Sequence, residues 1–66
     1  MIKVQKIKKL GNGRWDLWFA SVTDTETVLN EVRNRDLDVE VLDLTSIRVN
    51  SHHTYKTLFE KNILTK

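Results

Sequence analysis

Apolar residues flank the dipeptide Asn12-Gly13 on both sides, and this pattern predicts a β-hairpin at the start of the chain. Both central residues of a type I′ turn need positive φ, which Asn tolerates and Gly adopts without steric cost. The first strand is expected over residues 2–10, where Ile7 lies out of phase with the other apolar residues. That break in alternation indicates either a β-bulge near Gln5–Lys6 or a half-buried edge strand.

The length of the hairpin loop decides which side chains face the core. A two-residue loop is the preferred interpretation, and its cross-strand pairs are Gly11–Arg14, Leu10–Trp15, Lys9–Asp16 and Ile7–Trp18. Opposite charges and aliphatic–aromatic neighbours across strands are favourable pairs. This register puts Trp15, Leu17 and Phe19 on the core side and Trp18 on the other side. A three-residue loop over residues 11–13 is the alternative, and it sets Lys6 against Trp18.

Two later segments have the periodicity of amphipathic helices. Thr23, followed three residues later by Glu26, has the spacing of a capping box and predicts a helix over about 24–34. A second helix is expected over about 52–62, with Asn50-Ser51 as its N-cap. The apolar stripe of this second helix is Tyr55, Leu58, Phe59 and Ile63.

Residues 39–44 and 47–49 are predicted to be β structure, either as one long bent strand or as two short strands. Val39 and Val41 share one face and Leu42 and Leu44 the other, which indicates a bulge or twist between them. The element order is therefore β-β-α-β-(β)-α, and residues 1–66 are predicted to form a single α+β domain. Its mostly antiparallel sheet is expected to have one face covered by helix and the other face uncovered.

The net charge of +2 conceals a segregated distribution. Residues 1–14 carry five basic side chains and no acid, residues 15–46 have a net charge of −6, and residues 47–66 one of +3. The chain has no cysteine, which excludes disulfides and thiolate ligands, and two histidines do not complete a four-ligand zinc site. Because no apolar run approaches the ~18 residues of a membrane span, we expect a cytoplasmic protein with no membrane partner.

No residues at recognisable spacing predict catalysis. Ser, His and Asp all occur, but nothing in the sequence brings them together as a triad. The acids of residues 36–43 alternate like a calcium loop but lack its glycine and its terminal bidentate glutamate, so we interpret them as a solvated face. His52 and His53, adjacent on a helix, point ~100° apart and are interpreted as structural. We expect no enzymatic activity, no metal site and no cofactor.

The strongest candidate for a binding residue is Trp18, expected on the uncovered face among basic side chains. Such a ring can stack on a nucleobase or anchor a protein partner, and Tyr55 is the alternative anchor. The acids of residues 36–43 or the basic hairpin would steer the encounter. The candidate binding residues are Lys3, Lys6, Lys8, Lys9, Arg14, Trp18 and Tyr55.

The β-β-α-β order resembles that of several tiny phage and mobile-element proteins that bind and block a host enzyme. This resemblance rests on size and element order, and it implies an inhibitor or regulator of a larger host complex. We therefore predict a non-enzymatic protein-binding module, with nucleic-acid binding through the basic hairpin and Trp18 as the alternative. The acidic segment 15–46 weighs against the alternative, because dedicated nucleic-acid binders are usually more basic. Homodimer formation stays open.

Overall fold

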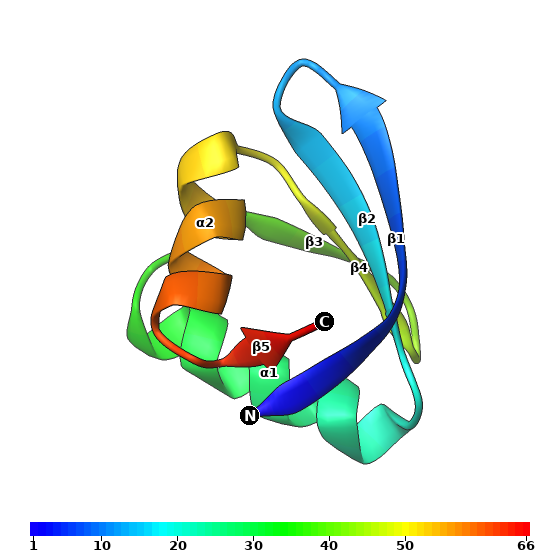
Figure 1. Ribbon diagram of the computed structural model, residues 1–66. Coiled ribbons are helices and arrows are strands. Elements are labelled where there is room, and N and C mark those ends of the chain that lie inside the picture. The colour runs from blue at the N-terminus through cyan, green and yellow to red at the C-terminus, as the bar shows by residue number, and fades with distance from the viewer.

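The computed structural model covers residues 1–66 and contains five strands and two helices (Figure 1). They are β1 (Ile2–Gly11), β2 (Arg14–Phe19), α1 (Val22–Asn34), β3 (Val39–Asp43), β4 (Ser46–Val49), α2 (His52–Glu60) and β5 (Leu64–Thr65). One sheet contains all the strands in the order β3-β4-β2-β1-β5. Its neighbouring strands are antiparallel except for β1 and β5, which are parallel. The predicted α+β class and element order are confirmed, and residues 39–49 form two strands.

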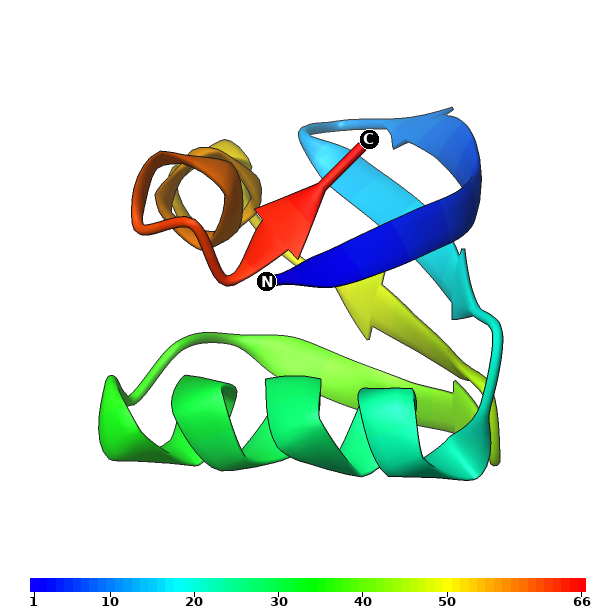
Figure 2. The ribbon, with the colours of Figure 1, turned by 60° about the horizontal axis from the view of Figure 1, so that its bottom comes forward.

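Both helices pack on the same face of the sheet. Leu17 of β2 and Ile47 of β4 are fully buried there, together with Val28 of α1 and Leu58 of α2. Figure 2 shows α1 running alongside β3, whereas α2 lies towards β5 at the other side of the sheet. Trp15 and Phe19 are also buried on this face, and Trp18 is half-buried. The predicted division of β2 into a core face and an outer face is confirmed. Neither helix is long and apolar enough to cross a membrane.

The hairpin turn forms at Asn12-Gly13, where both residues have the predicted positive φ of 53° and 75°. The preferred register is nevertheless wrong beyond the turn. Gly11 also has a positive φ, of 87°, and Leu10 is an extra residue that shifts the pairing by one position. The resulting pairs are Lys9–Trp15, Lys8–Asp16, Ile7–Leu17 and Lys6–Trp18, which are those of the alternative three-residue loop. A second shift between Val4 and Lys6 confirms the predicted bulge.

The first helix begins two residues earlier than predicted. Ser21 is the N-cap, and its hydroxyl accepts a hydrogen bond of 3.1 Å from the Asp24 N–H. Thr23 therefore lies inside the first turn and does not cap it, because Ser21 already supplies the acceptor that the orphan N–H needs. At α2 the predicted cap is confirmed, since the Ser51 hydroxyl accepts a hydrogen bond from the Thr54 N–H.

Candidate protein-docking surfaces

The outer face of the sheet holds the central residue of the predicted binding site. Trp18 of β2 is half-buried, and the Lys6 Nζ lies 4.9 Å from the centre of its ring. A cation over an aromatic face is attracted by the ring quadrupole. The Trp18 ring thus already has a partner on one face, and a nucleobase that stacked there would have to displace Lys6.

Next to Trp18, charges of alternating sign form a row across four strands. The register aligns Glu40 of β3, Arg48 of β4, Asp16 of β2 and Lys8 of β1 as successive cross-strand neighbours. The Arg48 guanidinium donates two hydrogen bonds to the Asp16 carboxylate, of 2.8 Å and 3.2 Å. These bonds are the main reason why the pKa of Asp16 lies below its ordinary value and that of Arg48 lies above it. We call this alternation the charge row.

The other predicted site residues do not gather around Trp18. Lys3 pairs with Thr65 of β5, and Arg14 lies beside the hairpin turn opposite Gly11. Lys9 pairs with Trp15, so it lies at the rim of the face that carries the helices. Tyr55, from α2, is also on that side. The predicted residues are therefore split between two faces of the sheet.

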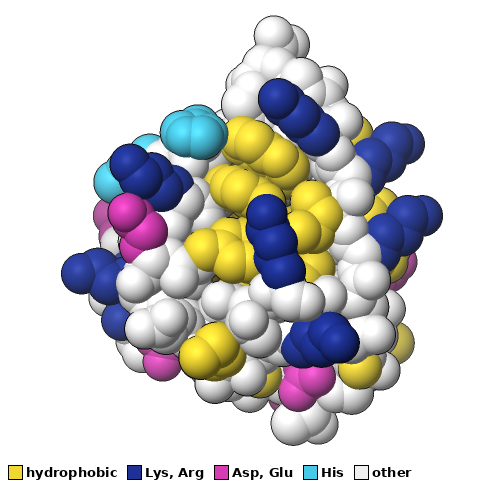
Figure 3. All heavy atoms as spheres, viewed as in Figure 1, with side chains coloured by type: hydrophobic (Ala, Val, Ile, Leu, Met, Phe, Trp, Pro, Cys, Tyr) yellow, Lys and Arg dark blue, Asp and Glu magenta, His cyan; other side chains and the backbone are white.

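Tyr55 belongs to an aromatic cluster with Trp15 and Phe59. Its ring is stacked on that of Trp15 with 4.2 Å between centroids and 14° between planes, and the centroid of the Phe59 ring lies 5.0 Å from that of Tyr55. The Lys66 Nζ lies over the Phe59 ring at 5.7 Å. Figure 3 shows hydrophobic side chains gathered between α2 and the hairpin, with a basic side chain across them. The rings largely cover one another, so this cluster serves first to join α2 to β2.

A different set of apolar side chains is exposed without any such cover. Apart from Met1, every large apolar residue classed as exposed lies at the β3 end of the molecule. They are Val22 at the start of α1, Val41 and Leu42 in β3, and Leu44 in the turn that follows. Leu44 is 74% exposed and Val41 58%. Folding thus leaves several apolar side chains exposed in and near the edge strand β3, and we call them the β3 patch.

This patch borders a groove between β3 and α1. One part of the groove, of about 470 Å³, is lined by Val22, Leu29, Val41 and Leu44 among others. The adjoining part, of about 360 Å³, continues along Leu29 and Val41 to Val39 and Leu37. Both parts share Leu29, Arg33 and Val41 and therefore adjoin each other between β3 and α1, and we call the two together the β3–α1 groove.

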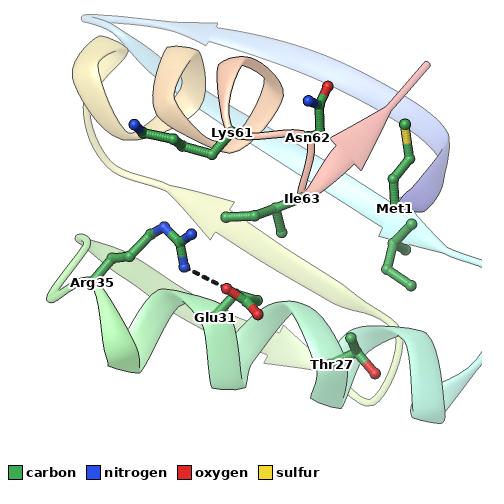
Figure 4. Close-up of a pocket in the computed structure, with 8 residues that line it drawn as sticks. Met1, Thr27, Glu31, Arg35, Lys61, Asn62 and Ile63 are labelled. Atoms are coloured by element: carbon green, nitrogen blue, oxygen red, sulfur yellow. Dashed lines mark hydrogen bonds and ion pairs between the residues drawn. The ribbon is translucent and has the colours of Figure 1, made fainter.

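A third hollow lies on the other side of α1, beneath the chain start and the α2–β5 turn. Its volume is about 230 Å³, and Ile63 points into it (Figure 4). Glu31 of α1 and Arg35, the residue that follows the helix as its C-cap, form an ion pair on its rim. Their charges compensate each other, and Lys61, which also lines the hollow, adds a positive charge. Elsewhere, no three His, Asp or Glu side chains are grouped as metal ligands would be.

Searches against protein-family models, curated proteins and solved structures gave no match.

The sequence interpretation assigned residues 36–43 to a solvated acidic face and did not identify the β3 edge as a site. One signal was present: Val41, Leu42 and Leu44 supply apolar side chains to both faces of a very short strand. A strand that is apolar on both faces needs cover on both sides or at its edge. Both helices of this domain pack on the same face of the sheet, so part of β3 stays uncovered.

Proposed function

We propose that this chain is a non-enzymatic protein-binding module that docks a larger partner through the β3 edge and the β3–α1 groove. The single observation that carries the proposal is the exposure of Val41, Leu42 and Leu44 along an edge strand, beside a groove lined by further apolar residues. Contiguous exposed apolar surface beside polar residues is typical of interaction sites. If the docked surface overlaps an active site or binding site of the partner, docking inhibits or regulates the partner.

The test is capture of a partner from a nuclease-treated lysate of the source cells. Wild-type protein is compared with Leu44→Lys, which places a charge in the groove at a side chain too exposed to matter much for folding. Gln5→Lys is the matched control, because it adds the same charge at an exposed position of β1. We expect the wild type and Gln5→Lys to retain the same protein and Leu44→Lys to lose it. Equal retention by all three would contradict docking at β3.

Nucleic-acid binding is the second candidate function. Its specific support is the outer face, where Lys6 pairs with Trp18 and Lys8 with the neighbouring Asp16. Random-sequence DNA at increasing salt separates the two proposals, because phosphate binding releases counterions and weakens steeply with salt. We expect no appreciable binding at low ionic strength. Salt-sensitive binding that is lost in Lys6→Ala would favour the nucleic-acid function instead.

A further inference from the structure

We propose that β3 accepts an extended segment of a partner protein as a sixth strand of the sheet, and that this segment alternates apolar with basic residues. The proposal deepens the function proposed above and rests on it, since it specifies the binding mode and the chemistry of the partner. Strand addition draws affinity from main-chain hydrogen bonds and specificity from alternate side chains.

The backbone of β3 is open on the side away from β4. The Asp38 carbonyl accepts a hydrogen bond from the Asn50 N–H, so residue 38 directs its backbone groups towards β4. Because successive residues of a strand point their backbone groups to opposite sides, Val39 and Val41 direct theirs outward. None of the hydrogen bonds outside the strand ladders involves Val39 or Val41. An incoming strand would find two residues with free donors and acceptors.

The rows of side chains across the sheet specify what the sixth strand carries. Val41, Ile47 and Leu17 form an apolar row on the core face, and Val39 with Val49 begins another. Along the strands, the charge row alternates with these two rows and lies on the outer face of the sheet. It ends at the β3 edge with the acidic side chain of Glu40. Opposite charges on neighbouring strands are stabilising and like charges are not. A residue placed beside Glu40 is therefore basic, and its two neighbours in the partner segment are apolar.

The groove provides the space for those apolar side chains. A strand beside β3 would direct alternate side chains towards α1, where Leu29 and Val22 line the β3–α1 groove. The same edge is acidic, since Asp36, Asp38 and Asp43 flank Glu40 along the chain. The basic residue nearest to them in the groove is Arg33, which also contacts Asn30. The electrostatic field of this edge thus attracts a basic segment.

Charge also decides between a foreign segment and a second copy of the chain. Antiparallel pairing of two β3 edges would bring Glu40 and Asp43 close to the same acids of the other copy. Such like-charge contacts are unfavourable. The lysine-rich β1 strand of a second copy has a suitable pattern, and β5 covers its outer edge only at Ile2 and Lys3, but pairing β3 of one copy with β1 of the next is heterologous and would add copies without closing. We therefore assign the edge to a different protein.

The experiment measures binding of short synthetic peptides by titration calorimetry, with sedimentation as a check for self-association. The probe is a soluble peptide of alternating lysine and valine. One control peptide alternates glutamate and valine, and a second retains the lysine–valine side chains but is N-methylated at alternate residues, which removes backbone donors. The protein variants are Glu40→Lys and, as the matched control at an exposed acid of α2, Glu60→Lys.

Of the three peptides, we expect only the unmodified lysine–valine peptide to bind the wild-type protein. Its affinity for Glu40→Lys should be about tenfold lower, and its affinity for Glu60→Lys should equal that for the wild type. Binding of the N-methylated peptide with equal affinity would overturn strand addition. Equal loss in both variants would overturn the role of Glu40, and self-association of the free protein through β3 would make a second copy the occupant. If partner capture is lost in Leu44→Lys but the peptide does not bind, this inference fails alone; if nothing is captured, the proposed function fails.

Discussion

Trp15 and Trp18 lie three residues apart on β2 but have different surroundings. Trp15 is buried against the ring of Tyr55, whereas Trp18 is half-buried on the outer face under Lys6. We expect Trp15→Ala to lower the free energy of unfolding by about 3–5 kcal/mol, as truncation of large core residues does. Trp18→Ala should cost at most about 1–2 kcal/mol, because a partly exposed ring buries less area. Urea denaturation of both variants measures this difference, and a larger loss for Trp18→Ala would contradict the assignment of faces.

Asp16 makes the stability of the fold depend on pH. Its pKa is lowered in the folded state, chiefly by the hydrogen bonds from Arg48, so the folded protein favours the charged carboxylate. This stabilisation is complete above the ordinary pKa of 3.8 and is lost as the pH falls through the lower folded value. We expect Asp16→Asn to be less stable than the wild type at neutral pH, with the difference closing as the pH falls below about 4. Denaturation midpoints between neutral and acidic pH test this; a difference that persists at the lowest pH would contradict it.

At the scale of elements, local sequence signals located every segment except the two-residue strand β5, but not their exact boundaries or pairing. The Asn12-Gly13 turn and the Ser51 cap were predictable because each depends on two or three adjacent residues. The hairpin register was not, because the extra residue at Leu10 depends on how Ile7 and Leu17 pack across the sheet. The start of α1 was ambiguous for a similar reason, since Ser21 and Thr23 are both suitable caps and only the path of the chain after Phe19 decides between them.

The capping assignment at α1 gives a test with an internal control. Ser21→Ala removes the acceptor for the Asp24 N–H and should lower the free energy of unfolding by ~1 kcal/mol. Thr23→Ala should be close to neutral, because no hydrogen bond of the Thr23 side chain caps the helix. Thermal and urea unfolding followed by circular dichroism compare the two variants. The opposite ranking would place the start of α1 at Thr23.

At the scale of the whole molecule, the proposed docking site depends on the order of the strands. The sequence indicated the apolar residues of β3 and the acidic residues between them, but not that β3 would be an edge strand beside α1. That depends on β4 pairing with both β3 and β2, a long-range choice that no local pattern records. The predicted anchors Trp18 and Tyr55 turned out to have partners within the chain, whereas Val41 and Leu44 have little cover.

Amide hydrogen exchange at Val39 and Val41 tests the open β3 edge most directly, measured with and without the lysine–valine peptide. In the free protein we expect both amides to exchange fast and the Glu40 amide, which points towards β4, to exchange slowly. Added peptide should slow exchange at Val39 and Val41 while Glu40 stays protected. Val39 and Val41 amides that are already protected in the free protein, or that gain no protection when the peptide is added, would contradict docking at this edge.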